Sequence, residues 1–581
     1  MFNKSTTIHL DDIKIDLFEY IDENSDFLKN QYLEYVFEIG NLKLDNQKLR
    51  KVLEYNNHSL WEMSLINEKN IYKNNNVFKT IKYLALRKIL FENISKKIQI
   101  FFLEKDLENI IKKEFDTKKL IFLNSEFSLK NKLKKSIIKS DIFNYLYFLY
   151  FFIKNCNFSK KNKSNFLKKK IFIFSYFTHY DNIKFSNGSF FPKQWAGLLK
   201  LLDKNFNFIQ LFLPNKDFKF FFQIKSFLEN KKINNLNAQN FLNNIIFFEY
   251  YSQIRENFKK FKTKVLFSEI EKLFKKNQKY EFFFLINKDL FISSFSGYTL
   301  LQNLLWISVF DNLLSNIPKH DYGIFLYENQ PWEKALITSW KKFKHGKLIG
   351  YSHTTINYWH LNYFNALDYN TSDNFEKFNP NYIAVSSQTS KNFLLNQSIN
   401  SEKILEVEAL RYLWILEKNC EPKKKRNKEI LFLGDYKNTT NKKLIEILKK
   451  LKISLIDLGF NITFKPHPAT FVKDIDKDIH QTNDDLELIV DRFDFVISSN
   501  TTSAIIEALS CGKTTFLFKD KNNFDLSPLK NTILEEKINF FYTDKDLLNK
   551  IDNNNDKIKP IKYYYLNKDL NRWKKILEIK N

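Results

Sequence analysis

Short apolar runs recur along the chain, separated by stretches long enough to form helices. The clearest are IFIFSYF (171–177), IFLYE (324–328), ILFLG (430–434) and FVISS (495–499). Strands buried on both faces of a parallel sheet have nearly continuous apolar runs of this kind, because helices cover both faces. The alternation of such runs with helix-length segments therefore predicts an α/β fold built on parallel sheets.

The same pattern extends through most of the chain. Further predicted strands are LIFLN (120–124), FIQLFL (208–213), IIFFEY (245–250), FFFLI (282–286), LIGYS (348–352), YIAVS (382–386), ILEVE (404–408), ITFKP (462–466) and TTFLF (514–518). A chain of 581 residues is too long for one core. We therefore predict a helical N-terminal region with a Rossmann-like domain in residues 1–378, a second Rossmann-like domain in 379–560, and a C-terminal helix in 561–581 that packs back on the first domain.

The charge of the chain changes this picture little. Lys and Arg number 92 against 66 Asp and Glu, a net charge of +26. The lysines are spread over the whole chain, without zinc-finger spacing or an RNP-like aromatic motif, so specific nucleic-acid binding is not expected. Peripheral contact with an anionic inner membrane remains compatible with this charge.

Cysteine usage and the apolar segments bear on the compartment. The three cysteines lie far apart without a CxxC pair, which favours a reducing cytoplasm over a disulfide framework. The first residues contain no apolar signal-peptide core. The most membrane-like run, IFNYLYFLYFFI (142–153), has twelve residues where a spanning helix needs about 20. It is interpreted as a buried core helix, with a helix on the membrane surface as the alternative.

Two polar clusters follow successive predicted strands in the second domain. Lys465 and His467 lie in KPHP after NITF, and Ser498, Ser499, Asn500, Thr501 and Thr502 end the strand FDFVI and precede the helix SAIIEALSCG. Ligands of open α/β sheets bind outside the carboxyl ends of the strands, so both clusters should face one crevice. Hydroxyls at a helix start leave backbone N–H groups free for an anion, and Lys465 and His467 would add charge-assisted donors. A phosphate site is therefore predicted here, although such hydroxyls elsewhere are often plain helix caps.

The KPHP and SSNTT pair resembles the HP and Ser/Thr motifs of bacterial GT-B transferases that use CMP-activated nonulosonic or Kdo-type sugars. The resemblance implies that His467 and the hydroxyls bind the nucleotide phosphate, and that residues 379–560 form the donor domain. Glu507, in TSAIIEALSCGK, lies where many GT-B enzymes hold a Glu against the donor. Lys513 stands where a Pro often follows the Gly, a minor departure.

A wider resemblance covers HSLWEMSLINEKNIYK (58–73), FLYENQPWEKALITSWKKFKHGKLIGYSHTTINYW (325–359) and LFLGDY (431–436). These segments are similar to an uncharacterised group of bacterial surface carbohydrate biosynthesis proteins, associated with lipopolysaccharide or capsule synthesis. The resemblance implies a sugar nucleotide as co-substrate rather than a bound cofactor, and a glycan or lipid-linked glycan as acceptor. It does not supply the identity of either.

The candidate catalytic base comes from the first domain. IFLYE ends a strand, and Pro331 suits the first turn of the following helix because its missing N–H is unused there. This leaves Glu328 on the crevice side, and the next strand ends near His353. A base facing the donor across a cleft is what an inverting transferase needs to deprotonate an acceptor hydroxyl. The alternatives are that Glu328 pairs with Lys334 and that His353 is a half-buried structural histidine.

The acidic run Asp474, Asp476 and Asp478 does not predict a metal site. No Gly follows at the turn position of an EF-hand, and no Glu closes the loop. We interpret the run as a solvated face and expect no metal.

These features together favour a metal-independent, inverting GT-B-like glycosyltransferase with two Rossmann-like domains facing a central cleft. The expected context is surface polysaccharide assembly in the cytoplasm, with peripheral membrane contact. A CDP-polyol phosphotransferase, which shares a similar HP and Ser/Thr arrangement, and a noncatalytic scaffold of a polysaccharide assembly complex remain alternatives.

Overall fold

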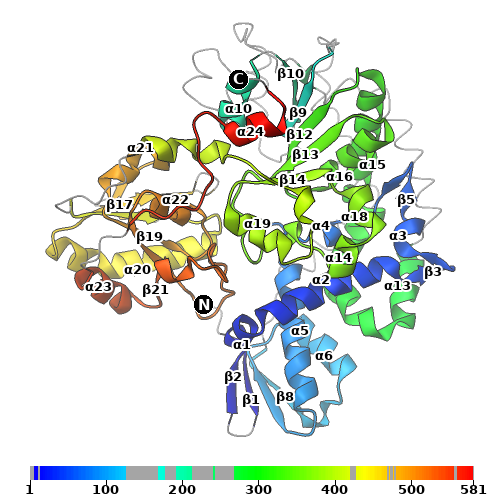
Figure 1. Ribbon diagram of the computed structural model, residues 1–581. Helices are drawn as coiled ribbons and strands as arrows, with labels where there is room; N and C mark the ends of the chain where they lie inside the picture. The colour runs from blue at the N-terminus through cyan, green and yellow to red at the C-terminus, as the bar shows by residue number, and fades with distance from the viewer. Residues whose placement is uncertain are drawn as a thin grey trace.

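A computed structural model describes residues 5–10, 13–125, 168–176, 192–203, 205–211, 240–241, 267–418, 427–467, 470, 475–476, 479–554 and 559–579. The interpreted helix at 142–153, the predicted strand at 245–250 and the residues Asp474 and Asp478 lie outside these ranges. Figure 1 shows two α/β lobes and a smaller N-terminal region that touches both.

The N-terminal region forms its own small sheet. Its strand order is β2-β1-β7-β8, with β1 (Thr7–Leu10), β2 (Ile13–Asp16), β7 (Ile98–Phe101) and β8 (Leu120–Leu123). The helices α1 (Leu17–Glu23), α2 (Ser25–Asn41), α5 (Asn76–Glu92) and α6 (Lys105–Glu114) accompany it. The prediction of a mostly helical start was therefore incomplete, since β1 and β2 form a hairpin that pairs with β7.

Four short elements connect α2 to α5. They are the hairpin β3 (Lys43–Leu44) with β4 (Gln47–Lys48), helix α3 (Leu49–Val52), the hairpin β5 (Glu54–Tyr55) with β6 (His58–Ser59), and helix α4 (Leu65–Glu68).

The first large sheet is parallel throughout and has the order β11-β10-β9-β12-β13-β14-β15. Its strands are β9 (Ile171–Tyr176), β10 (Phe206–Leu211), β11 (Asn240–Phe241), β12 (Tyr322–Leu326), β13 (Lys347–Tyr351), β14 (Tyr382–Val385) and β15 (Ile404–Glu406). Counted along the chain, the order is 3-2-1-4-5-6-7, an extended Rossmann arrangement. Its switch point lies between β9 and β12, where the direction of winding reverses.

A helix that packs between α15 (Tyr298–Asn316) and the N-terminal helices corrects a predicted strand. FFFLI (282–286) lies in α14 (Glu281–Ser296), between α13 (Phe267–Lys276) and α15. A helix buried on most sides carries an uninterrupted apolar run, which periodicity alone does not distinguish from a buried strand. Next to the site, α16 (Pro331–Lys342) packs closely on β12, because a Cβ at Gly323 would come within 2.8 Å of Trp340.

The second large sheet repeats the Rossmann order on a smaller scale. Its order is β18-β17-β16-β19-β20-β21, formed by β16 (Glu429–Leu433), β17 (Asn461–Lys465), β18 (His480–Gln481), β19 (Phe495–Ser499), β20 (Thr514–Phe518) and β21 (Asn539–Phe541). Helices α20 (Asn438–Asp457), α22 (Ala504–Ser510) and α23 (Asp544–Asp552) flank it. Two hydrophobic clusters form the core of this domain.

The predicted boundary at residue 378 is wrong. β14 pairs with β13, and β15 pairs with β14, so both strands extend the first sheet. The sequence from 379 onward contains strand and helix signals of the same kind as those before it, so local pattern could not show which sheet they join. The second sheet begins only at Glu429.

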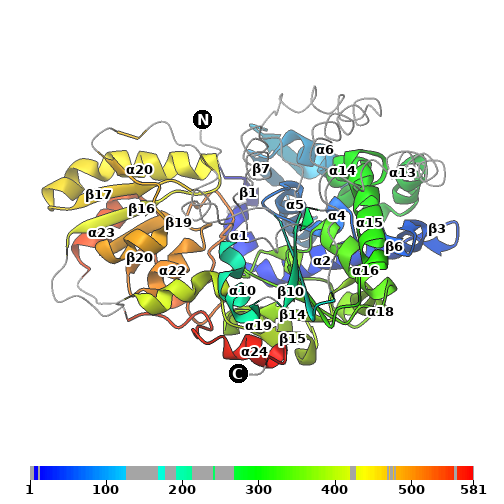
Figure 2. The ribbon, with the colours of Figure 1, turned by 90° about the horizontal axis from the view of Figure 1, so that it is seen from above.

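The C-terminal segment returns to the first domain. Helix α24 (Asn571–Ile576) places the buried Trp573 against Tyr351, with ring centroids 5.3 Å apart. Glu408 accepts hydrogen bonds from the backbone N–H groups of Arg572 (2.9 Å) and Trp573 (3.2 Å). Figure 2 shows α24 beneath the first lobe, next to β15 and α19 (Gln388–Leu395).

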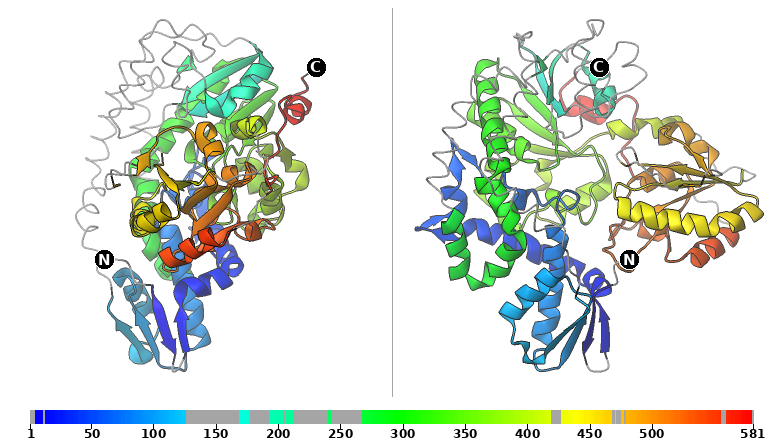
Figure 3. Two further views of the ribbon diagram at one scale, coloured as in Figure 1. Left: turned by 90° about the vertical axis from the view of Figure 1, so that its left-hand side faces the viewer. Right: turned by 180° about the vertical axis from the view of Figure 1, so that it is seen from behind.

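The structure confirms the predicted α/β class and its GT-B-like arrangement of two Rossmann-like domains. Figure 3 shows the second domain from its outer side and from behind, as a separate lobe beside the first. Among the described residues, no helix is long and apolar enough to cross a membrane.

Candidate functional site

The switch point of the second sheet is organised by Asp435, which sequence reasoning missed. Asp435 follows β16 and is 2% exposed. Its carboxylate accepts hydrogen bonds from the hydroxyls of Ser499, the last residue of the neighbouring strand β19, and of Thr501 just beyond it. The same carboxylate accepts from the backbone N–H of Lys437 at 2.9 Å. The carboxyl ends of β16 and β19 are thus tied together where a Rossmann domain usually binds its ligand.

This arrangement changes the role of the predicted hydroxyl cluster. Ser498 and Ser499 are 0% exposed, and Ser498 donates to the carbonyl of Ser499 at 3.0 Å. The prediction that these two hydroxyls bind phosphate is not supported, because they are buried strand residues with internal partners. Asn500 is 6% exposed and donates toward the carbonyl of Phe524. Thr502 accepts from the N–H of Ala504 at 3.4 Å, as a helix cap would.

The KPH segment lies beside the end of β16. Gly434 donates its N–H to the carbonyl of Lys465 at 2.8 Å, and a Cβ at Gly434 would come within 3.1 Å of the His467 nitrogen. A side chain at this position would therefore have to displace the KPH backbone by a few tenths of an ångström. Tyr436 lies edge-on to His467, with ring centroids 5.7 Å apart. The two predicted motif regions thus meet at one edge of the sheet.

The pKa values of the two basic side chains of this segment, Lys465 and His467, are both lowered. Burial lowers the pKa of His467; Asp435 opposes this shift, and Lys465 and Arg411 add to it. His467 is therefore neutral at neutral pH in the unliganded protein, and it would donate an ordinary, not a charge-assisted, hydrogen bond to a ligand. Burial also lowers the pKa of Lys465, against the nearby charges of Asp485, Asp484 and Glu507.

Glu507 in α22 completes this edge. It is 9% exposed, and burial raises its pKa to about 7, with Arg411 and Lys465 opposing the shift. A carboxyl group with this pKa changes its charge in the physiological range. Perturbed carboxyl groups of this kind are common at functional sites.

Arg411 is the second residue that sequence reasoning missed. It lies in the segment Leu410–Glu417 that connects the two sheets, and its side chain is exposed. Its positive charge affects His353 in the first domain and both His467 and Glu507 in the second. Composition could have pointed to Arg411, because an arginine is unusual in so lysine-rich a chain. A guanidinium also binds two phosphate oxygens at once better than an ammonium does.

At the first sheet, Glu328 lies just beyond β12, and Pro331 occupies the first turn of α16 as predicted. The backbone N–H of Glu328 donates to both carboxylate oxygens of Glu333, at 3.0 and 3.1 Å. Gln330 donates to the Glu328 carboxylate at 2.6 Å. The side chain of Glu328 is 24% exposed, so a fixed backbone presents a carboxylate that solvent and substrate can reach.

The alternative pairing of Glu328 with Lys334 does not occur. Lys334 is buried and donates instead to the carbonyl of Phe378 (3.0 Å) and to Asn379 (3.2 Å). Glu333 is fully buried, and both burial and the charge of Glu328 raise its pKa well above the usual range. Glu333 is therefore suited to holding the Glu328 loop rather than to contacting substrate.

His353 lies next to Glu328, as the sequence analysis predicts for residues that follow neighbouring parallel strands. Its Nε2 is 3.8 Å from the Glu328 carboxylate, and its Nδ1 has no hydrogen-bond partner within the described part of the chain. Burial, assisted by Arg411, lowers the pKa of His353 to about 3. A group with so low a pKa is a weak base at neutral pH. Its side chain is also only 4% exposed, against 24% for that of Glu328, so Glu328 is the more accessible of the two.

The segment Tyr72–Lys73 of the N-terminal region interacts electrostatically with residues at both sheet edges. Tyr72 hydrogen-bonds His360 at 2.9 Å, and burial together with the charge of Asp435 raises the pKa of Tyr72. Lys73 pairs with Glu68 at 2.5 Å, and Glu328 contributes to its raised pKa, against the effect of burial. One short segment is thus electrostatically close to Asp435 of the second domain and to Glu328 of the first.

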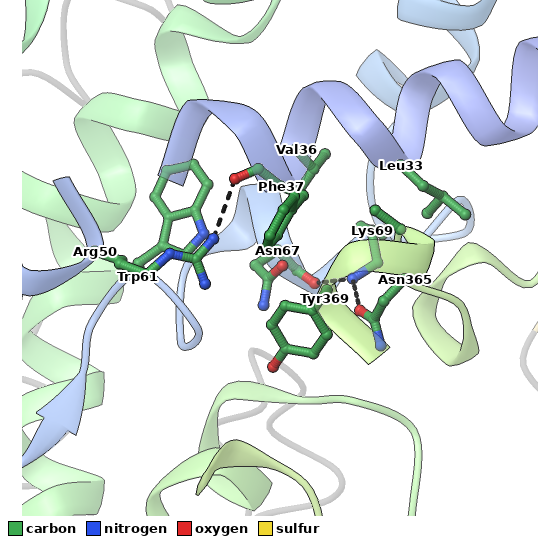
Figure 4. A pocket seen from close by; sticks show the side chains of 10 residues that line it. Leu33, Val36, Phe37, Arg50, Trp61, Asn67, Lys69, Asn365 and Tyr369 are labelled. Carbon is green, nitrogen blue, oxygen red and sulfur yellow. Dashed lines mark hydrogen bonds between the residues drawn. The ribbon is translucent and has the colours of Figure 1, made fainter. Parts of the chain in front are cut away.

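One small cavity lies between α2 and residues 365–369. Figure 4 shows Lys69 pointing into it, where the ammonium donates to the carbonyl of Asn67 (2.9 Å) and to Asn365 (3.1 Å). Its volume of about 10 Å³ accommodates about one water molecule. It is far too small for a nucleotide and is interpreted as part of the packing between the N-terminal region and the first domain.

The acidic run has charge partners where it is described. Asp476 lies 3.8 Å from Lys449 and 3.6 Å from Lys452 of α20. Within the described ranges, no group of three or more His, Cys, Asp or Glu residues could hold a metal ion.

No family model and no curated protein matches the chain. Solved structures do match. The UDP-GlcNAc 2-epimerase of Methanocaldococcus jannaschii covers 71% of this chain and 99% of its own, at 15% identity and a TM-score of 0.40. The UDP-GlcNAc 2-epimerase of Neisseria meningitidis bound to UDP-GlcNAc covers 66% and 90%, at 12% identity and 0.35. The glycotransferase of kitacinnamycin covers 67% and 92%, at 7% identity and 0.35.

These identities and TM-scores are too low to carry a reaction or a substrate over to this chain. The class follows from the topology of the chain itself. It is an α/β protein with two Rossmann-like domains in a GT-B-like arrangement, and polar residues gather at the carboxyl ends of both sheets.

Proposed function

We propose that the chain is a glycosyltransferase that binds a sugar nucleotide at the carboxyl edge of the second sheet. The observation that carries this proposal is the meeting of Arg411, Lys465, His467 and Glu507 at the switch point of a Rossmann sheet. Cationic and neutral donors suit the oxygens of a diphosphate or phosphodiester. A buried carboxyl group beside them suits the hydroxyls of a sugar or ribose.

The proposed base is Glu328. Its carboxylate is accessible, and its backbone N–H is held by the Glu333 carboxylate. The Tyr72–Lys73 segment interacts electrostatically both with Glu328 and with Asp435 of the second domain. Deprotonation of an acceptor hydroxyl by Glu328 would make the oxygen a nucleophile toward the anomeric carbon. Arg411 and Lys465 would stabilise the negative charge that develops on the leaving phosphate.

The finer assignment remains part of the proposal. A CMP-linked nonulosonic or Kdo-type donor rests on the resemblance of KPHP and SSNTT, with Ser498 and Ser499 no longer counted as ligands. The acceptor we propose is a glycan or lipid-linked glycan of surface polysaccharide synthesis. The net charge of +26 is compatible with work at an anionic membrane surface.

A thermal-shift screen of the full chain with CMP, CDP, UDP and GDP tests the proposal. A nucleotide that binds the native state raises Tm in a concentration-dependent way. We expect the nucleotides with one particular nucleobase to raise Tm the most, and Arg411→Met to abolish that rise in Tm. No shift with any of the four would favour a noncatalytic scaffold.

Product analysis separates the enzyme alternatives. Incubation with a matching sugar nucleotide and a glycan acceptor should release nucleotide and extend the acceptor by one sugar. Transfer of phosphate to the acceptor together with CMP release would instead identify a CDP-polyol phosphotransferase.

A further inference from the structure

A loop of the second domain is anchored in the core of another part of the molecule. This clasp loop, Lys519–Lys530, follows β20, yet Phe524 and Leu526 belong to the hydrophobic cluster of the N-terminal region and first domain. Phe524 is 7% exposed. Its ring centroid lies 4.2 Å from that of Phe78, 5.4 Å from that of Phe18 and 6.0 Å from that of Trp359.

Ion pairs fix the same loop from its two ends. Asp22 of α1 lies 3.5 Å from the ammonium of Lys519 and 3.4 Å from that of Lys530. Lys519 also pairs with Asp525 at 2.7 Å. The chain that follows β20 therefore lies beside α1, at the boundary of the second domain and the N-terminal region in Figure 1. Charge and apolar burial act together here, so the contact is stronger than a surface ion pair alone.

The clasp loop also reaches the candidate nucleotide edge. The side-chain amide of Asn500, directly after β19, donates toward the Phe524 carbonyl at 3.5 Å and toward the Asp525 carboxylate at 3.4 Å. The same Asp525 oxygen accepts the N–H of Ser527 at 3.0 Å, which fixes the turn of the loop. Asp525 is 1% exposed, so its position depends on the packing around it.

We propose that Phe524 and Asp525 are positioning residues that hold Asn500 at the nucleotide site only while the clasp loop is docked on the N-terminal region. Because Asn500 borders Ser499 and Thr501, which bind Asp435, undocking would loosen the whole carboxyl end of β19. Nucleotide binding and docking of the N-terminal region then reinforce each other, since coupling between two equilibria is reciprocal. The nucleotide part of this inference rests on the proposed function; the positioning of Asn500 does not.

Hydrogen exchange of the nucleotide-free chain tests the positioning directly. Phe524→Ala should raise exchange at residues 17–24, where the loop docks, and also at 500–504, where the site lies. Phe524→Leu keeps an apolar side chain and should restore protection at both segments. Ile533→Ala is the matched control, because Ile533 is 86% exposed a few residues further along and should change neither.

Titration of the same variants with CMP, CDP, UDP and GDP tests the coupling. For a nucleotide that binds the wild type, Phe524→Ala should weaken affinity about 5- to 150-fold, the usual range for coupled sites. Asp22→Asn, a milder change, should weaken it less and make it less sensitive to salt, because ion pairs to Lys519 and Lys530 are screened. If Phe524→Ala fails to fold, Asp22→Asn decides both measurements: it should raise exchange at 17–24 and 500–504 to a smaller extent, and weaken affinity.

The outcomes are separable. Raised exchange at 17–24 with unchanged exchange at 500–504 would overturn the positioning role of Phe524. Unchanged affinity in Phe524→Ala for a nucleotide that binds the wild type would overturn the coupling. Absence of binding by the wild type to all four nucleotides would overturn the proposed function, while the exchange at 500–504 would still decide the positioning.

Discussion

At the carboxyl end of the first sheet, most of the polar side chains are buried; at the same end of the second sheet, several of them are exposed or partly exposed. Glu333, Lys334 and His353 are all buried, and Glu328 alone of this group is reachable. Across the boundary, Arg411 is exposed, and Lys465 and His467 are only partly buried. One edge thus presents a single fixed carboxylate, and the other presents a set of donors.

The difference indicates that the two sheet edges have different roles. A carboxylate on a rigid support is suited to proton transfer, for which geometry matters more than affinity. Several cations and neutral donors are suited to binding an anionic group. Substitutions on the first edge should therefore change turnover, and those on the second should change affinity.

The largest effect is expected for Glu328→Gln, which keeps the shape but removes the basicity. Turnover should fall about 10²- to 10⁴-fold with little change in nucleotide affinity. Glu376→Gln, at an exposed glutamate of the same domain, is the matched control. Steady-state kinetics and a nucleotide titration measure the two quantities. Near-normal turnover would move the base to His353.

Arg411→Met should have the next largest effect, now on affinity. Losing hydrogen bonds from a charged donor costs about 1.5–3 kcal/mol, roughly a 10- to 150-fold weaker Kd. Arg411→Lys should recover only part of this, because an ammonium does not form the two parallel bonds of a guanidinium. Arg492→Met, at an exposed arginine of the second domain, should bind nucleotide as the wild type does. Equal affinities of the Arg411 and Arg492 variants would exclude Arg411 from the site.

A smaller effect is expected for His467→Ala. Burial lowers the pKa of His467, so the neutral ring contributes about 0.5–1.5 kcal/mol, or about a 2- to 13-fold change in Kd at pH 7.5. Affinity should rise as the pH falls through the lowered pKa, because the ring then gains a positive charge. Calorimetry of the wild type and the variant between pH 5 and 8 checks this, and identical pH profiles would contradict it.

The smallest effect concerns stability and Glu507. Burial raises its pKa to about 7, so the protonated form is the one that the fold favours. Its contribution to stability is fully present below the ordinary pKa of a glutamate and is lost as the pH rises through about 7. Wild type should therefore lose Tm relative to Glu507→Gln between pH 5 and 8, by about 2–4 °C for each kcal/mol. A difference in Tm between wild type and Glu507→Gln that stays constant across that pH range would show that the pKa of Glu507 is not raised.

Most strands of the fold could be predicted from the sequence, but the boundary between the two domains could not. Apolar runs identified strands such as IFLYE and FVISS, because burial on both faces leaves a clear signal. FFFLI was misread because a buried helix leaves the same signal. The domain boundary was misplaced because β14 and β15 join the first sheet through long-range pairing, which local pattern does not contain.

The candidate site shows a similar limit. Strand ends marked Glu328, Lys465 and His467, since the position of a residue after a strand can be read from the chain. Asp435 and Arg411 were missed because their importance depends on neighbours distant in sequence: the hydroxyls of Ser499 and Thr501 for one, and His353 with Glu507 for the other. Burial of Ser498 and Ser499 could likewise be seen only in three dimensions.

The central claim is that the carboxyl edge of the second sheet binds the phosphate of a nucleotide, opposite Glu328. A crystal structure of the full chain in complex with the nucleotide that gives the largest thermal shift tests it most directly. The account predicts phosphate oxygens within hydrogen-bonding distance, about 2.7–3.2 Å, of Arg411, Lys465 or His467, with Glu507 on the sugar or base side. A phosphate bound at the first sheet, beside Glu328 and His353 and away from all three donors, would contradict it.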